Sequence, residues 1–555
     1  MFNMDFKRKV ILTGLLITLL ALGLPYATSG QPSQVSPPKL ILSLVVDGLT
    51  ENWIQQNWDL LGEGGFKKIL RNGVQYTQAE IPHMLSGSAP SLATLSTGTL
   101  PATHGIIADQ WYNRLRREEI HPTENYLLQS IGSDGMPGKH GPEKLLATTF
   151  GDQLILRTNG KSRVVSLAIQ PQNSILMGGH GRMGCYWYDK RSGQWITSSA
   201  YQQELPVWLQ EFNSKKSSDL YIGQDWNLIL SESMYQSCMP DANPFETGYT
   251  GGFKTFPYKM NRIRRESMDR DYGVLTQSPF GNTMLVDLAL AAVNGERLGE
   301  DHYPDLMMIS FSSVYQIARL FGSDSREVLD AMLRLDMDIQ HLLYQTEETV
   351  GRNQLLVILT STHGMVRDPD YAKYLGLPNG YFRYRNAMAL LNSYLSAIFG
   401  EGVWIENYFR QQIYLNEAQL EKSDKPYHEV IESAARFLTK FEGVAFASPV
   451  DRLSNGLTPE PWSQLVHNSY HPDRSGDIIL ILQPGWMEDS GFDTDCLSPY
   501  PYDRRIPLIW YGWGLQSARI NRKVNLRDVA PTLSYITGIP APDAASGELM
   551  REVVK

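Results

Sequence analysis

Two short segments of the chain carry side chains that could do chemistry. Asp47 directly follows an apolar run at residues 40–46, and His363 comes soon after another apolar run at residues 355–359. Carboxylate and imidazole groups bind divalent cations and also transfer protons. Both runs are typical of buried parallel strands, whose carboxyl ends share one edge of a sheet, where ligands bind. The sequence therefore predicts a site at that edge.

The same kind of apolar run recurs along the chain. Further strands are expected at residues 163–169, 306–310, 478–482 and 506–511, and helices at residues 283–293 and 326–343. Buried strands that alternate with amphipathic helices are typical of an α/β sheet with helices on both faces.

Composition and charge exclude some classes of function. The 555-residue chain has a formal net charge of −9 and no basic run after its first residues, which argues against a nucleic-acid partner. Its three cysteines can form at most one disulfide, so the chain is not a disulfide-stabilised scaffold.

The first 29 residues are typical of a signal peptide. Lys7, Arg8 and Lys9 form a positive start, residues 10–24 are apolar, and small residues at 27–29 suit cleavage. The apolar run is shorter than the roughly 20 residues that span a membrane, so we expect no transmembrane helix after its removal. An uncleaved anchor is the alternative. We expect an exported protein, periplasmic or secreted.

Residues 90–106, with the sequence PSLATLSTGTLPATHGI, resemble the nucleophile loop of the alkaline phosphatase superfamily. The similarity is greatest to its bacterial phosphate-irrepressible and type I phosphodiesterase/nucleotide pyrophosphatase-like branch. Matching segments at residues 278–283, 474–477 and 510–513 extend the resemblance over residues 39–545. It implies an alkaline-phosphatase-like α/β fold: a central, mostly parallel sheet flanked by helices, with cap loops and an inserted α+β subdomain.

The expected domain organisation follows from these patterns and the resemblance. A signal peptide (1–29) and a linker (30–38) precede a core at residues 39–384, which includes a cap region at residues 180–275. An inserted α+β subdomain (385–470) is followed by the C-terminal part of the core (471–555).

The resemblance implies two metal ions held by six protein ligands. Asp47 and His363 stand at two of these positions, and the other four carry residues that differ from the family ligands: Tyr315, Arg319, Thr362 and Cys496. Two protein ligands make a weak site, because catalytic zinc takes three. We therefore expect no cofactor, and zinc if the chain is active. We also expect the Arg319 guanidinium to pair with Asp47 in place of a metal.

The resemblance also implies a nucleophile and a phosphate clamp. The nucleophile is expected four positions before the Thr-Gly pair, where this chain has Ala93, and the neighbouring Thr94 is a candidate substitute. The clamp positions, a lysine and an arginine in the family, are Gln170 and Gln172. An alanine cannot attack phosphorus, and glutamines carry no positive charge.

These differences favour a pseudoenzyme: an exported, catalytically inactive family member that binds a periplasmic or envelope protein, or a small ligand in the old cleft. The alternative is a metal-dependent phosphoric-ester hydrolase, a phosphatase or phosphodiesterase, with a rearranged site around Asp47, Thr94 and His363. A structural component of the envelope is a third hypothesis.

Overall fold

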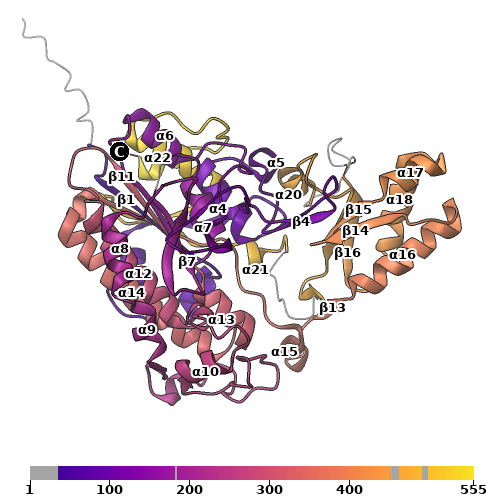
Figure 1. The fold of residues 1–555 in the computed structure, drawn as a ribbon. Helices are drawn as coiled ribbons and strands as arrows, with labels where there is room; N and C mark the ends of the chain where they lie inside the picture. The colour runs from indigo at the N-terminus through magenta and orange to yellow at the C-terminus, as the bar shows by residue number, and fades with distance from the viewer. Residues whose placement is uncertain (1–35, 182–183, 451, 453–461, 490–497, 555) are drawn as a thin grey trace, which may run out of the picture. The chain divides into compact units, whose positions relative to one another are not determined.

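A ten-stranded sheet lies at the centre of the fold, seen in a computed structural model that describes residues 36–181, 184–450, 452, 462–489 and 498–554 (Figure 1). Its order is β20-β2-β19-β12-β1-β11-β6-β7-β8-β5. Five neighbouring strands are parallel: β12 (Leu355–Thr360), β1 (Leu40–Val46), β11 (Asp305–Phe311), β6 (Val164–Ala168) and β7 (Gly184–Asp189). The predicted α/β fold class is confirmed.

Antiparallel pairs extend the sheet on both sides of this parallel centre, and the outermost pair on one side, β2 with β20, is parallel again. The outer strands are β19 (Leu508–Gly512), β2 (Val74–Glu80), β20 (Ala518–Asn525), β8 (Gln194–Ser198) and β5 (Ser130–Ile131). β19 is antiparallel to β12, and β8 is antiparallel to β7. The predicted strand at residues 506–511 is thus present, but it runs opposite to its neighbour.

Helices cover both faces of the sheet. One hydrophobic core includes alternate residues of β1 and side chains of α3 (Phe66–Asn72), α8 (Val207–Ser214), α12 (Pro279–Gly295), α13 (Ser313–Phe321) and α14 (Arg326–Val350). The core on the other face includes side chains of α4 (Ser88–Thr97), α6 (Phe150–Arg157), α7 (Pro171–Gly178), α20 (Trp462–Ser469) and α22 (Val529–Thr537). Because β1 is buried on both faces, its sequence is apolar throughout rather than alternating.

The region predicted as an irregular cap contributes to the central sheet. Residues 184–198 form β7 and β8, so the aromatic segment around Trp187 is a buried strand pair. Besides α8, this region also contains short elements, among them α9 (Ser217–Ile222), β9 (Asp225–Trp226), β10 (Tyr258–Lys259), α10 (Met260–Glu266) and α11 (Gly273–Thr276).

A second sheet, with order β14-β15-β17-β16, has its own hydrophobic core. Its elements are α16 (Tyr384–Phe399), β14 (Ile405–Phe409), β15 (Gln412–Leu415), α17 (Glu417–Ser423), α18 (Tyr427–Leu438), β16 (Val444–Pro449) and β17 (Ile478–Leu482). β17 was expected in the central sheet, but it pairs antiparallel with β15 and β16. An apolar run suits any strand that is buried on both faces, so composition alone could not choose between the sheets.

A hairpin of the core contacts this inserted subdomain. The hairpin consists of β3 (Trp111–Asn113) and β4 (Glu118–Ile120). The Tyr112 hydroxyl donates to Glu406 at 2.9 Å, and the Arg114 guanidinium pairs with Asp477 at 2.5 Å. These contacts fix the subdomain against the part of the core that follows α4.

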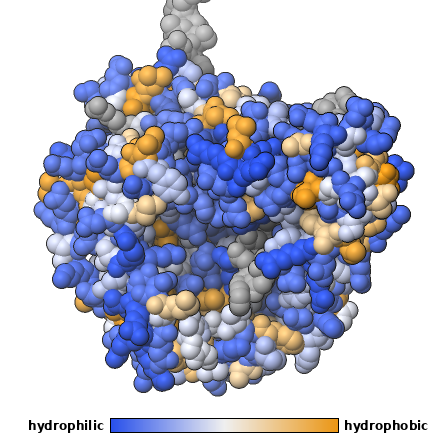
Figure 2. Space-filling view, turned by 45° about the vertical axis from the view of Figure 1, so that its right-hand side comes forward, coloured by the Kyte–Doolittle hydropathy of each residue, from blue (hydrophilic) through white to orange (hydrophobic). Residues whose placement is uncertain are grey.

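The hydropathy of the surface and of the helices concerns where the protein is located. Figure 2 shows a mostly hydrophilic face on which apolar side chains form small, separate groups. No helix within the described residues is long and apolar enough to cross a membrane. The predicted signal peptide and most of the predicted linker lie outside the described residues.

Candidate active site at the carboxyl ends of the central strands

Asp47 and His363 lie at the same edge of the sheet because β1 pairs in parallel with both of its neighbours. Val46 is in register with Phe311, and Val45 with Thr360. The backbone N–H of Asp47 donates to the Phe311 carbonyl at 3.0 Å, which fixes the residue just beyond β1. The structure thus brings together the two side chains at which the sequence predicts a site.

The Asp47 carboxylate is buried and accepts three hydrogen bonds. Thr362 Oγ1 donates to it at 2.5 Å, Ser88 Oγ at 3.2 Å and Asn173 Nδ2 at 3.5 Å. Only 1% of Asp47 is exposed, and this burial raises the pKa of its carboxyl, although His363 and the hydroxyl donors act in the opposite direction. Three neutral donors therefore satisfy the Asp47 carboxylate. The sequence predicted an ion pair between this carboxylate and Arg319 instead.

Ser88 is the hydroxyl that faces this carboxylate. It is the first residue of α4, and its Oγ also lies 3.4 Å from Nε2 of His363. Ser88 is 8% exposed, whereas Ser91 and Thr94 of the same helix are fully buried. Ser88 is therefore the hydroxyl of this helix that both contacts the candidate base and reaches solvent.

The hydrogen bonds of His363 define its tautomer. Its Nδ1 lies 2.7 Å from the Gly364 carbonyl oxygen, which can only accept a hydrogen bond. Nδ1 therefore carries the proton in the neutral ring, and the lone pair of Nε2 points toward Ser88. The ring of Tyr315 packs edge-on against the imidazole with centroids 4.4 Å apart. The imidazole is thus held in the orientation that a general base needs.

Ala93 and Thr94 lie in the interior of α4 and do not face Asp47. Ala93 is fully buried, and its carbonyl accepts the Thr97 hydroxyl. The Thr94 hydroxyl donates to the Pro90 carbonyl at 2.8 Å and lies 3.1 Å from His104 Nε2. Both side chains thus have structural roles within the helix and its neighbours.

Within the described residues, the positions of the expected metal ligands do not form a two-metal centre. Thr362 is a hydroxyl donor to Asp47, Tyr315 packs on His363, and Arg319 lies on α13 one turn after Tyr315. Within the described residues no group of three His, Cys, Asp or Glu side chains is placed to hold a metal ion. Cys496 lies outside the described residues, whereas Cys185 and Cys238 are free thiols.

The two glutamines expected at the clamp lie beside the start of α4. Gln170 precedes α7 and Gln172 lies in its first turn, and both line a cavity of about 570 Å³. Gln172 Nε2 lies 3.4 Å from Asp109 Oδ1, which also accepts the backbone N–H of Ala89 at 2.7 Å. This chain of contacts connects the cavity to the residue that follows Ser88.

Ser88 and Asp109 are not among the site residues that the sequence predicts. The nucleophile is expected four positions before the Thr-Gly pair, and that position, Ala93, lies in the middle of α4. The signal that could have found Ser88 is its position at the start of that helix, directly after Gly87. A side chain there points out of the helix end rather than into its packed face.

Comparisons with known proteins identify the relatives of this chain. The sequence profile of the type I phosphodiesterase/nucleotide pyrophosphatase family matches residues 41–498. The alkaline phosphatase PhoV of Synechococcus elongatus is 29% identical, with 94% of each chain covered. The alkaline phosphatase PafA of Elizabethkingia meningoseptica is 31% identical, with 94% of this chain and 95% of the relative covered.

The prediction of a catalytically inactive protein is contradicted by these relatives. These two chains match over nearly their whole length and are named alkaline phosphatases, which favours the alternative stated above, a phosphoric-ester hydrolase. The pseudoenzyme hypothesis depended on the joint loss of the nucleophile, the metal ligands and the phosphate clamp. For the nucleophile, the structure places the hydroxyl of Ser88, rather than Ala93, beside Asp47 and His363.

The fold supports the same relationship. A crystal structure of the alkaline phosphatase PafA superposes with a TM-score of 0.89 at 30% identity, covering 94% of this chain and all of the other. The family profile covers most of the chain, including the strands that position Asp47 and His363. The chain therefore belongs to the type I phosphodiesterase/nucleotide pyrophosphatase family, within the alkaline phosphatase superfamily.

Proposed function

We propose that this protein is a phosphoric-ester hydrolase that uses Ser88 as its nucleophile. The observation that carries the proposal is the position of the Ser88 hydroxyl, 3.2 Å from the Asp47 carboxylate and 3.4 Å from His363 Nε2. A serine within hydrogen-bonding reach of an imidazole, whose other nitrogen is held by a third group, is the arrangement that activates a hydroxyl nucleophile.

The reaction proceeds in two steps in this proposal. In the first, the single hydrogen of the Ser88 hydroxyl turns from the Asp47 carboxylate to His363 Nε2. Ser88 Oγ then bonds to phosphorus, the bond from phosphorus to the leaving oxygen breaks, and His363 Nε2 takes the serine proton and gives it to the leaving alcohol. In the second, water attacks the phosphoserine, His363 takes a proton from that water, and it gives this proton to Ser88 Oγ as the bond from phosphorus to Ser88 breaks and phosphate leaves. Burial raises the pKa of Asp47, although His363 and the hydroxyl donors Thr362 and Ser88 act in the opposite direction.

The spacing of residues in a relative supports this placement. In a solved variant of PafA, 30% identical with a TM-score of 0.88, a threonine is replaced by serine and an asparagine 21 positions later by alanine. Ser88 and Asp109 have the same separation in this chain. That variant also replaces a lysine and an arginine two positions apart, as Gln170 and Gln172 are here.

The described donors do not fit the two metal ions that the resemblance implies. Asp47 and His363 are two ligands, and zinc that takes part in catalysis is held by three. The proposal therefore derives no step from a metal ion. Thr94 is not the substitute nucleophile in this proposal, because its hydroxyl donates a hydrogen bond to the Pro90 carbonyl.

The decisive test compares Ser88→Ala with Thr94→Ala on a phosphate monoester and a diester, both of p-nitrophenol. We expect Ser88→Ala to lower kcat/KM by a factor of about 10³ or more, as the loss of a nucleophile does. Thr94→Ala should keep most of the activity. Acid quenching and peptide mass spectrometry should find phosphate on Ser88. A wild-type protein inactive on both esters, or an unchanged rate for Ser88→Ala, would rule out the proposal.

We also propose that the protein acts after export, in the periplasm. The positive start and apolar run of residues 7–24 support this proposal. N-terminal sequencing of the protein from fractionated cells tests it, because export predicts a mature chain that begins near residue 30.

A further inference from the structure

The cavity of about 570 Å³ that Gln170 and Gln172 line lies at the same edge of the central sheet as Ser88. Its wall includes residues that follow β6 and residues at the end of β7, two strands that are parallel to β11 and, through it, to β1. Parallel strands end at one edge of a sheet, where ligands bind. The volume is within the range of small-molecule sites.

The first turn of α7 connects this cavity to the proposed nucleophile. Gln172 lines the cavity and lies 3.4 Å from Asp109, which accepts the backbone N–H of the residue after Ser88 at 2.7 Å. The next residue, Asn173, donates to Asp47 at 3.5 Å. The organic part of an ester whose phosphorus lies at Ser88 therefore has this cavity beside it.

Lys190 presents an ammonium group to the cavity. The other cations of the wall have partners: Arg191 donates to the Asp134 carbonyl, and Lys139 donates to the Tyr126 carbonyl at 3.2 Å. The ammonium of Lys190 forms no hydrogen bond or ion pair with any residue that the structure describes. The residue is exposed, so a ligand in the cavity can reach it.

The carboxylates of the same wall are engaged by other groups. Asp189 accepts two serine hydroxyls at 2.5 and 2.8 Å, and Glu124 lies 3.8 Å from His121. Asp271 accepts a backbone N–H at 2.8 Å and attracts Lys190 without forming an ion pair with it. The charge of Lys190 is thus only partly balanced by its own protein.

The ammonium of Lys190 lies in a recess rather than on an open surface. Burial lowers its pKa although the residue is exposed, and both observations hold for a side chain whose open surface faces a cavity. The charge of Arg319, on α13, lowers the same pKa, whereas Asp271 acts in the opposite direction. A bound anion would stabilise the charged amine against burial and against the second cation.

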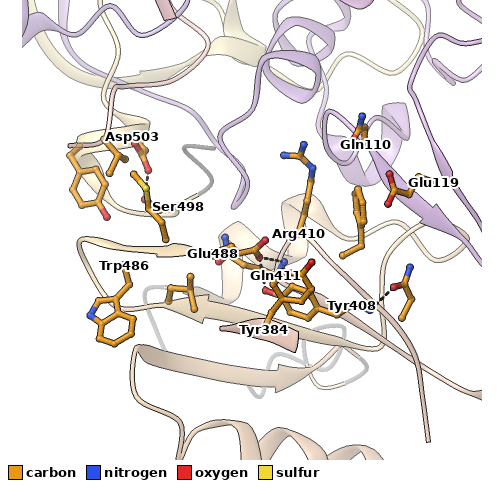
Figure 3. Close-up of a pocket in the computed structure, with 16 residues that line it drawn as sticks. Gln110, Glu119, Tyr384, Tyr408, Arg410, Gln411, Trp486, Glu488, Ser498 and Asp503 are labelled. Atoms are coloured by element: carbon orange, nitrogen blue, oxygen red, sulfur yellow. Dashed lines mark hydrogen bonds between the residues drawn. The ribbon is translucent and has the colours of Figure 1, made fainter. Parts of the chain in front are cut away.

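A different cavity, of about 280 Å³, is lined by residues of the core and of the inserted subdomain (Figure 3). Its polar groups bond to one another: the Tyr408 hydroxyl donates to Glu488 at 2.5 Å, and the Ser498 hydroxyl donates to Asp503. The cavity at Lys190 differs from it in offering a cation that a ligand can pair with.

We propose that the cavity receives the organic part of a phosphoric ester that carries a second oxyanion, a carboxylate or a phosphate, and that the Lys190 ammonium binds this oxyanion. The inference rests on the proposed function, because it places the ester phosphorus at Ser88. It adds the class of substrate, an ester with an anionic group on its organic part. Charge-assisted hydrogen bonds from an ammonium to an oxyanion are stronger than those between neutral groups.

The test uses phosphonates, which bind without being hydrolysed. The acids 3-phosphonopropanoate, 5-phosphonopentanoate and 7-phosphonoheptanoate are titrated calorimetrically into the full chain, each beside its amide, which has the same size and lacks the carboxylate charge. We expect at least one acid to bind about tenfold more tightly than its amide, as a hydrogen bond to a charged group allows. Bisphosphonates of the same lengths show which oxyanion the cavity prefers, and tighter binding of either kind supports the proposal.

Three variants locate the binding. Lys190→Gln should abolish the preference for the charged probe, and Lys190→Arg should keep most of it. Lys161→Gln, at an exposed lysine before β6, is the control and should behave as the wild type. Thermal unfolding without ligand checks that each variant is folded, which the exposure of both lysines favours.

The outcomes separate this inference from the hydrolase proposal. Charged probes that bind no better than the amides at every length, or a preference that Lys190→Gln leaves unchanged, would overturn the inference even if the protein hydrolyses phosphoric esters. A preference that depends on Lys190 supports the inference, and a lack of hydrolysis in the same preparation would then count against the hydrolase proposal alone.

Discussion

The hydroxyl oxygen of Ser88 lies 3.4 Å from Nε2 of His363, two residues that are 275 positions apart in the sequence. The other ring nitrogen of His363 lies 2.7 Å from the carbonyl of Gly364, so the lone pair of Nε2 faces the hydroxyl. A backbone carbonyl thus orients this imidazole, the role that a carboxylate has in serine–histidine–aspartate triads. The hydrolase proposal depends on this geometry.

The backbone at Gly364 should be indispensable to the orientation of His363. A Cβ at Gly364 would lie 2.0 Å from the Tyr502 carbonyl oxygen, and that backbone cannot move aside easily. We expect Gly364→Ala to lower stability by about 1–3 kcal/mol, as overpacking does, and to lower kcat. Urea unfolding and ester hydrolysis measure both effects. Gly223→Ala is the control, because its Cβ would meet no atom closer than 3.4 Å; equal stability of the two variants would contradict the prediction.

A carboxylate at position 362 should create a requirement for a cation. Thr362 is buried and its hydroxyl lies 2.5 Å from Asp47, so Thr362→Asp places two carboxylates side by side. Without metal we expect a loss of about 3–5 kcal/mol of stability, the cost of an uncompensated buried charge. Zinc should restore it, because three ligands then converge.

The measurement for this prediction is the melting temperature with and without zinc chloride. Thr362→Asn is the matched control, since it has the same size without the charge, and it should not respond to zinc. A melting temperature of Thr362→Asp that zinc leaves unchanged would show that the three side chains cannot share an ion.

The pair of His180 and Asp152 should stabilise the fold most in mildly acidic solution. His180 Nδ1 lies 3.0 Å from Asp152, whose carboxylate raises the pKa of the imidazole, while His180 and backbone donors lower the pKa of Asp152. The histidine contribution is complete below its ordinary pKa of about 6.5 and is lost as the pH rises through its raised value. The aspartate contribution is present above about pH 4 and is lost in stronger acid.

His180→Gln should therefore cost more stability near pH 6 than near pH 9, by less than about 1 kcal/mol because the pair is partly exposed. Denaturant unfolding at both pH values gives the difference. His428→Gln, an exposed histidine, should show no such dependence. An equal cost of His180→Gln at both pH values would mean that the pair makes no ionic contribution.

Glu246 should make the fold less stable as the pH rises. The residue is 4% exposed, its two carboxyl oxygens have no hydrogen-bond partner within the described residues, and burial raises its pKa to about 9. A raised pKa means that its contribution is complete below about pH 4.5 and is lost as the pH rises toward 9. Glu246→Gln removes this loss, so its stability should fall less between pH 6 and pH 9, by at least about 1 kcal/mol.

The pH dependence of urea unfolding for the wild type and Glu246→Gln measures this difference. Burial also raises the pKa of Glu327, to about 7. Both proteins contain this residue, so its effect on the pH dependence of stability is the same in both curves. Parallel curves for the two proteins would show that Glu246 is paired in solution.

The sequence alone determined the class of the fold and one part of the site. Continuous apolar runs such as residues 40–46 and 355–359 require strands that are buried on both faces, and that requirement leads to a parallel sheet covered by helices. The polar residues that follow these runs, Asp47 and His363, must then meet at the carboxyl edge. This part of the site is local to strand ends, so it could be predicted.

Only the tertiary structure decided which hydroxyl lies beside Asp47 and His363, and which of the two sheets contains β17. Ser88 faces Asp47 only because α4 begins at that residue and points its first turn at the sheet edge, whereas Ala93 and Thr94 turn into the packed interior. β17 belongs to the second sheet because it pairs with β15 and β16, which the chain reaches well before β17. Both outcomes depend on long-range packing and on the direction of side chains around a helix, which residue types and spacing along the chain do not encode.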